Sequence, residues 1–210
     1  IDRIRLGSLE PRIITEEFAE ALSLLPKICP HFHLSLQSGC DATLKRMNRQ
    51  YNADEYYQKC CILRKYFDDP ALTTDVIVGF AGETEEEFAQ CKAFLEKIEF
   101  FETHVFKFSI RKGTRAAKTE NQVPDQIKTK RSNELLTLHE VNSTKYLQDH
   151  LGKDLEVLME EKMTIGEETY FVGHTKEYIR VAVRTEEDLT NQFVTVKAKE
   201  ILKDQILLGE

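Results

Sequence analysis

The sequence predicts an α/β fold, namely part of a parallel βα barrel followed by a small all-β barrel of the oligonucleotide-binding type. Strand-like apolar segments alternate with helical segments as far as about residue 150, and this alternation is typical of a parallel sheet. After that point, five short strand-like segments follow one another with polar turns between them, as in small closed barrels. We therefore expect two domains, residues 1–150 and residues 151–210.

One segment of the first domain is especially informative. Residues 74–78 form a β-branched apolar run, which predicts a buried parallel strand. The turn Gly79-Phe80-Ala81-Gly82-Glu83 follows directly, and a helix is expected over residues 84–98. Glycine allows close approach of the backbone, and ligands of α/β folds bind at the carboxyl ends of the strands. This turn is therefore a candidate ligand-binding rim.

The remaining elements follow from periodicity and capping residues. In the first domain, strands are expected at 1–6, 31–36, 75–78 and 103–109, and further helices at 15–25, 41–47, 53–67 and 125–150. In the second domain, strands are expected at 154–160, 170–174, 178–184, 193–199 and 205–208.

The composition is that of an ordinary globular protein, with 41% hydrophobic and 31% charged residues among 210. No apolar run approaches the roughly 20 residues of a membrane helix. The five cysteines have neither Cys-x-x-Cys nor Cys-x-x-x-Cys-x-x-Cys spacing, so we expect reduced thiols in a cytoplasmic protein and no metal site. His31, His33 and His104 also lack ligand spacing and are interpreted as strand or rim residues.

The charge is unevenly distributed along the chain. The net charge of −7 argues against indiscriminate binding of nucleic acid. Between residues 107 and 131, however, there are eight Lys and Arg residues and only two acidic residues, Glu120 and Asp125. Such a basic band suits a phosphate backbone, although a solvated loop and helix face would give the same pattern.

Several motifs occur in a fixed order: residues 33–39 (HLSLQSG), 44–49 (LKRMNR), 75–80 (DVIVGF), 82–84 (GET) and 112–114 (KGT). Together they resemble the later part of the radical S-adenosylmethionine methylthiotransferases. Residues 151–210, with Val-Gly-His-Thr at 172–175, resemble the TRAM domain of that family.

The resemblance implies an iron–sulfur enzyme that adds a methylthio group at C2 of a modified adenosine next to the anticodon of tRNA. Residues 8–11 (SLEP) resemble the branch that acts on N6-threonylcarbamoyladenosine. The family's Cys-x-x-x-Cys-x-x-Cys motif, which holds a 4Fe–4S cluster, is not in this chain. The chain would thus be a fragment that lacks the N-terminal portion of its parent enzyme and is inactive alone.

The same resemblance implies contacts with S-adenosylmethionine. Gln37, with the adjacent Ser38, ends a strand, where an amide can bind a ribose diol or simply form a turn. Arg49 lies at a spacing at which superfamily members bind the methionine carboxylate, with Arg46 as a rival. The counterpart of Glu10 meets the methionine amino group, although a loop acceptor is the alternative.

Three further residues complete this set of expected cofactor contacts. Asp75 can bind ribose or adenine, or cap a turn. Gly79 is expected to allow the backbone to approach the ligand. Phe108 can frame the adenine or pack in the core.

We expect tRNA as the partner. The expected contact residues are Lys107, Arg111, Lys112 and Arg115 in the basic band, and Lys176, Tyr178 and Arg180 in the barrel. Three alternatives remain open: a non-catalytic RNA-binding product of a truncated gene, a sister enzyme that modifies a ribosomal protein, and one that modifies isopentenyladenosine in tRNA. The sequence does not define the oligomeric state.

Overall fold

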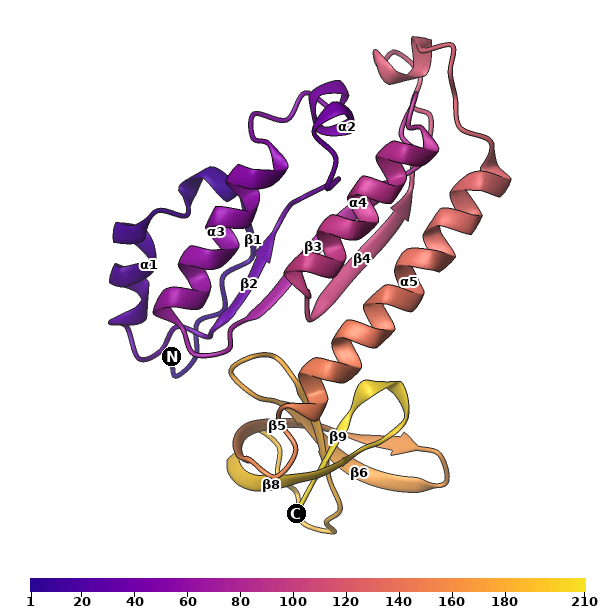
Figure 1. The fold of residues 1–210 in the computed structure, drawn as a ribbon. Coiled ribbons are helices and arrows are strands. Elements are labelled where there is room, and N and C mark those ends of the chain that lie inside the picture. The colour runs from indigo at the N-terminus through magenta and orange to yellow at the C-terminus, as the bar shows by residue number, and fades with distance from the viewer.

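The computed structural model describes all 210 residues and confirms the α/β class (Figure 1). The first part contains one sheet in which all four strands are parallel, in the order β1-β2-β3-β4. Its strands are β1 (Ser8–Leu9), β2 (His31–Leu34), β3 (Ala71–Val78) and β4 (Glu102–Lys107). Because the strands are parallel and sequential, their carboxyl ends meet at one edge of the sheet.

Helices connect these strands and begin where the sequence supplies caps. Three caps accept the N–H of the third residue after them: Thr15 before α1 (Glu16–Ser23), Asn52 before α3 (Ala53–Tyr66) and Thr84 before α4 (Glu85–Ile98). The other helical elements are η1 (Pro11–Ile13), α2 (Asp41–Arg46), η2 (Ala116–Lys118), α5 (Asp125–Gln148) and η3 (Lys203–Gln205). No helix combines the length and the apolarity that crossing a membrane requires.

The strand expected at residues 1–6 is wrong. In that segment only Ile4 forms a β-bridge, with Ile28, and the first strand is Ser8–Leu9. The arginines of the segment explain the difference, because they hold it against the barrel instead of a sheet. Arg3 donates to the carbonyl oxygens of His174 and Glu156 at 2.7 and 2.9 Å.

One face of the sheet packs against helices, and the other carries none (Figure 1). Val76 and Val78 on β3 are fully buried in a core shared with the helices. Asp75 and Ile77 alternate with them and are only partly buried, because they lie on the helix-free face. β3 starts at Ala71, earlier than predicted, because its first four residues are also buried although two of them are threonines.

The second part is a closed five-stranded barrel in the order β5-β6-β7-β9-β8. Its strands are β5 (Asp154–Ile165), β6 (Glu168–His174), β7 (Arg180–Val183), β8 (Phe193–Ile201) and β9 (Leu207–Gly209). A Cβ atom at Gly173 would lie 2.1 Å from the carbonyl oxygen of Leu158, so the close pairing of β5 with β6 at this point requires glycine. The expected division at residue 150 lies between the end of α5 and the start of β5.

The two parts are joined through α5, through an aromatic contact and through the arginines of the N-terminal segment. Leu147, at the end of α5, is fully buried in the core of the barrel. His31 on β2 meets Tyr178 of the barrel edge-on, with ring centroids 5.5 Å apart. Burial, with Arg5 nearby, lowers the pKa of His31 to about 4, so this ring is neutral at physiological pH.

A buried ion pair fixes α5 to the glycine-rich turn after β3. Nη1 of Arg131 lies 2.7 Å from Oε2 of Glu83, and the two side chains are 5% and 2% exposed. The same carboxylate oxygen accepts the N–H of Gly79 at 2.7 Å. Burial raises the pKa of Glu83, whereas the Gly79 N–H and Arg131 oppose this shift. The turn and the helix therefore share one compensated buried charge.

Replacing Arg131 with methionine should destabilise the fold by about 3–5 kcal/mol, because the buried Glu83 carboxylate loses its charge partner. Adding Glu83→Gln to this variant should recover part of the loss, since no buried charge then remains. Urea unfolding followed by circular dichroism measures both effects. Lys65→Met, which breaks an exposed pair with Glu16, is the control and should change little. An Arg131→Met variant with the parent unfolding midpoint would contradict the role of the pair.

Candidate functional site

The carboxyl edge of the sheet opens onto a cavity of about 610 Å³, a size typical of small-molecule sites. Three of the residues predicted to bind the cofactor line it: Gln37, Asp75 and Phe108. Lys107 and Arg111, which were predicted to bind RNA, also line this cavity. The structure thus brings together residues that are far apart in the sequence, at the edge where ligands of parallel sheets bind.

Gln37 enters this cavity from a strained position. Its φ of 72° lies in the left-handed region, which residues other than glycine rarely adopt. The Gln37 N–H donates to the carbonyl of Asp75 at 2.8 Å, and its carbonyl accepts the N–H of Ile77 at 2.9 Å. These bonds continue the pairing between β2 and β3 beyond the end of β2. Backbone strain that is held in this way concentrates at functional sites.

Aromatic residues form another wall. Phe108 and Phe80 meet edge-to-face with ring centroids 4.8 Å apart. Phe80 belongs to the turn that the sequence marks as a candidate rim, whereas Ile77 and Phe106, which also line the cavity, were not among the predicted site residues. For Ile77 and Phe106 a signal was present, because the two-residue period of a strand places them on the same face as Asp75 and Phe108.

Arg49 lies in an adjoining cavity of about 370 Å³, which shares Ile77, Phe80 and Ala116 with the first. Its rival, Arg46, donates to both carboxylate oxygens of Glu87, and this hydrogen bonding raises the pKa of Arg46. Arg49 forms no ion pair within the chain. Of the two arginines, Arg49 is therefore the one left available for a carboxylate ligand.

Three other predicted residues have their polar groups engaged outside the cavity lining. Glu10 accepts the backbone N–H and Nε of Arg12. Ser38 is fully buried, and its hydroxyl accepts the N–H of Cys40. Gly79 has a φ of 69°, and a Cβ atom there would lie 2.3 Å from Cγ of Lys128. The close approach that this glycine permits is therefore an approach to α5.

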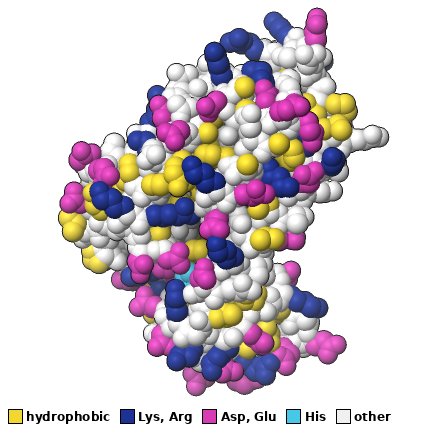
Figure 2. Space-filling model, viewed as in Figure 1, with side chains coloured by type: hydrophobic (Ala, Val, Ile, Leu, Met, Phe, Trp, Pro, Cys, Tyr) yellow, Lys and Arg dark blue, Asp and Glu magenta, His cyan; other side chains and the backbone are white.

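The basic band divides into exposed and buried residues. Arg111, Lys112 and Arg115 are exposed on the loop after β4. Lys128 and Arg131, which also belong to the band, are only 5% and 4% exposed, so their charges are paired inside the protein and do not face a ligand. On the helix-covered face, Figure 2 shows Lys and Arg interspersed with Asp and Glu, without a large patch of one sign.

The predicted RNA-binding residues of the barrel lie at the junction of the two parts. Tyr178 stacks on His174 with centroids 4.1 Å apart, and the Arg5 guanidinium lies 3.8 Å from the centroid of the same ring. At such distances these neighbours occupy opposite ring faces, so neither face is free to stack on a base. Arg180 and Tyr178 line a cavity of about 450 Å³ at this junction. Lys176, which is close to both residues in the sequence, is half-buried.

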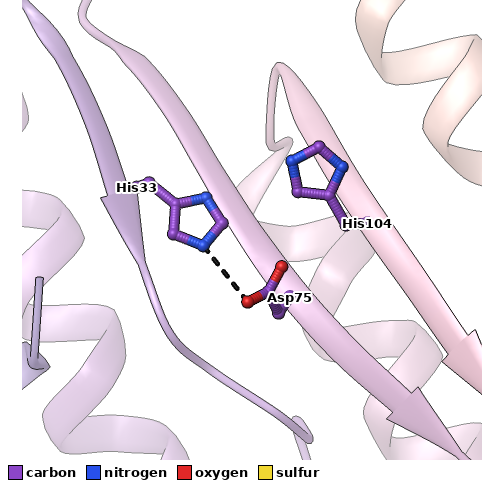
Figure 3. A group of neighbouring side chains, drawn as sticks. All are labelled: His33, Asp75 and His104. Carbon is purple, nitrogen blue, oxygen red and sulfur yellow. Dashed lines mark ion pairs between the residues drawn. The ribbon is translucent and has the colours of Figure 1, made fainter. Parts of the chain in front are cut away.

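The structure also brings together three side chains that the sequence did not connect. His33, Asp75 and His104 come from three neighbouring strands and face one another on the helix-free side of the sheet (Figure 3). Nε2 of His33 lies 3.3 Å from Oδ2 of Asp75. No sequence spacing reveals this group, because its members are brought together only by the strand register.

Comparison with known proteins shows which proteins the chain resembles. Residues 2–95 match the model of the radical SAM superfamily. The chain is 39% identical over 94% of its length to threonylcarbamoyladenosine tRNA methylthiotransferase MtaB of Bacillus subtilis. It is 36% and 38% identical to the tRNA-2-methylthio-N(6)-dimethylallyladenosine synthases of Clostridium botulinum and Caldicellulosiruptor saccharolyticus, over 94% and 95% of its length. The chain is related to the radical SAM tRNA methylthiotransferases.

This relation confirms the resemblance recognised in the motifs. The chain spans less than half of these relatives: 44%, 44% and 42% of their lengths, respectively. Among solved structures, coproporphyrinogen III oxidase (HemN) of Escherichia coli, described as a radical SAM enzyme, aligns with a TM-score of 0.56 and 12% identity. The alignment covers 83% of this chain and 46% of that one, and it supports the fold.

The cysteines of this chain do not suit an iron–sulfur cluster. All five are free, and four are buried. Burial raises the pKa of Cys60 to about 12 and that of Cys91 to about 11, which disfavours the thiolate that a cluster requires. The residues present therefore provide no cluster site.

Proposed function

We propose that this chain is the part of a tRNA methylthiotransferase that binds both S-adenosylmethionine and the tRNA. The similarity to methylthiotransferases along almost the whole chain carries this proposal. The cavity at the carboxyl edge of the sheet supports this proposal, because ligands of parallel sheets bind at that edge.

Within this family we propose N6-threonylcarbamoyladenosine as the substrate nucleoside. The Ser-Leu-Glu-Pro segment at residues 8–11 and the 39% identity to the relative named for that nucleoside support this choice. The relatives named for dimethylallyladenosine are 36% and 38% identical, so the nucleoside requires a direct test.

The cavity residues suit S-adenosylmethionine chemically. The Gln37 amide can donate and accept hydrogen bonds with the two ribose hydroxyls. Phe108 and Phe80 offer an aromatic wall to the adenine and exclude water from it. Arg49 can pair with the methionine carboxylate in the adjoining cavity. When bound, S-adenosylmethionine supplies the methyl group and, with a reduced iron–sulfur cluster held elsewhere, the radical chemistry of this class.

Gln37→Ala and Arg49→Ala should each weaken binding of S-adenosylmethionine. Loss of the charge-assisted contact of Arg49 costs about 1.5–3 kcal/mol, which corresponds to roughly tenfold or more in affinity. Loss of the neutral hydrogen bonds of Gln37 costs about 0.5–1.5 kcal/mol each, which corresponds to roughly two- to tenfold. Calorimetric titration of the protein with S-adenosylmethionine measures the change. Gln50→Ala is the control, because Gln50 is exposed next to Arg49 but lines neither cavity. Unchanged affinity in both cavity variants would disprove the assigned contacts.

The exposed part of the basic band is the proposed tRNA-binding surface. Arg111, Lys112 and Arg115 lie on the loop after β4, where Arg111 lines the cavity of about 610 Å³ and Arg115 lines the adjoining cavity of about 370 Å³, so this loop borders the space that a substrate base would enter. Cations at this position can neutralise the phosphates that flank the base, and each neutralised phosphate releases counterions. Lys176 and Arg180 form a second proposed contact at the junction with the barrel. Tyr178 holds the two parts together there, in place of stacking on a base.

Replacing Arg111, Lys112 and Arg115 together with alanine should weaken tRNA binding and reduce the slope of log affinity against log salt, because fewer phosphates are neutralised. Salt-titrated binding of unmodified tRNA measures both quantities. A charge-matched control replaces Lys59, Lys65 and Lys97, which lie on α3 and α4, and should leave the slope unchanged. The same slope in the loop variant as in the parent would remove the loop from the RNA interface.

Nucleoside mass spectrometry tests the proposed function directly. The enzyme that contains this chain, produced in a host lacking the 2-methylthio modification, should restore it on N6-threonylcarbamoyladenosine of tRNA. Restoration on isopentenyladenosine would correct the nucleoside while keeping the enzyme class. A methylthio group on a ribosomal protein, or tRNA binding without any modification, would overturn the proposal in favour of one of the two remaining alternatives.

A further inference from the structure

Three side chains that no sequence spacing connects meet on the helix-free face of the sheet. His33 comes from β2, Asp75 from β3 and His104 from β4 (Figure 3). Asp75 and His104 are direct partners in the β3–β4 register, and His33 lies on the other side of Asp75. One ligand atom from each residue lies within 4.8 Å of the other two. A parallel sheet is a rigid support for such a group.

The chemistry of this group suits a divalent transition metal. Two imidazoles and one carboxylate are a common ligand set for Zn²⁺ and its neighbours in the first row, at metal–ligand distances of about 2.0–2.2 Å. Two donors on one tetrahedral ion thus lie about 3.4 Å apart. The three donor atoms lie within 4.8 Å of one another, so the largest separation exceeds this by up to about 1.4 Å. The exposed ring of His104 can close such a gap by rotating about its side-chain bonds.

The surroundings of His33 favour a ligand at its Nε2 atom. Nδ1 of this ring lies 2.9 Å from the hydroxyl of Thr73, which fixes the ring and directs Nε2 toward Asp75. Metal-binding histidines commonly have their second ring nitrogen held in this way. Nε2 is itself buried, and although it lies 3.3 Å from Oδ2 of Asp75, it makes no hydrogen bond of acceptable geometry. A buried polar atom without a partner is costly, and a metal ion would satisfy it.

We propose that His33, Asp75 and His104 bind one divalent transition-metal ion of the Zn²⁺ class. Three protein donors leave at least one coordination position open, as in zinc sites that bind a further ligand. Asp75 also lines the cavity of about 610 Å³, so the open position adjoins the space proposed for the cofactor. The proposal does not rest on the methylthiotransferase function, and it gives Asp75 a role other than contact with a ribose.

Cobalt(II) serves as a spectroscopic probe of this site. The chain, stripped of metal with a chelator, should bind one Co²⁺ with visible bands of nitrogen and oxygen ligation and without thiolate bands. His33→Gln, Asp75→Asn and His104→Gln should each weaken this binding at least about tenfold, since even the loss of a residue that only hydrogen-bonds to a metal ligand costs about 10–100-fold. Zn²⁺ should compete for the site and raise the Tm of the parent protein, but not that of the variants.

His174→Gln is the matched control, because His174 forms a similar pair with Glu160 at 3.0 Å but has no third donor beside it. This variant should bind Co²⁺ like the parent. His104 is exposed, so His104→Gln tests the site without depending on the packing of the core. Unchanged Co²⁺ affinity in this variant, thiolate bands in the Co²⁺ spectrum, or no binding by the parent would each overturn the proposal. The His33–Asp75 contact would then be an ordinary polar pair.

Discussion

The arrangement of the whole molecule depends on the buried contact between Glu83 and Arg131. Glu83 closes the turn after β3, and its carboxylate is shared between the Gly79 N–H and the guanidinium of α5. Since α5 also places Leu147 in the core of the barrel, this helix contributes to the position of the barrel, together with the contacts of Arg3 and Tyr178. A change at the turn would therefore alter the cavity wall and the barrel together. Charge compensation at one buried point couples the two parts of the chain.

The glycine-rich turn borders the cavity, but its glycine has a different role from the one that the sequence suggested. The sequence suggested that Gly79 leaves room for a ligand, and the cavity does open at this edge. The space beside Gly79, however, is filled by the stem of Lys128, and its N–H is bonded to Glu83. The turn forms one rim of the cavity through Phe80, whereas its glycine is required for packing against α5.

The sequence revealed what depends on local physics. Most helices and strands were predicted from features such as the Thr84 cap and the apolar run of β3, because capping and burial patterns depend on residues close together in the sequence. It did not reveal what depends on register. His33, Asp75 and His104 meet only because three strands align in one particular way, and periodicity within each strand contains no information about that alignment. The buried state of Arg131 was equally hidden, since a charge pattern does not distinguish a solvated arginine from one that is paired inside.

The geometry also constrains any RNA that uses both proposed contact regions. The basic loop precedes the start of α5, whereas Arg180 lines a cavity together with His139 of that helix. The helix rises about 21 Å between Asp125 and His139, so the two regions are separated by a distance of at least that order. A short stem-loop seated on the basic loop can reach the cavity without touching the barrel. Lys176 and Arg180 therefore contribute to binding only when the RNA extends along α5, and a folded tRNA differs in this respect from its isolated anticodon arm.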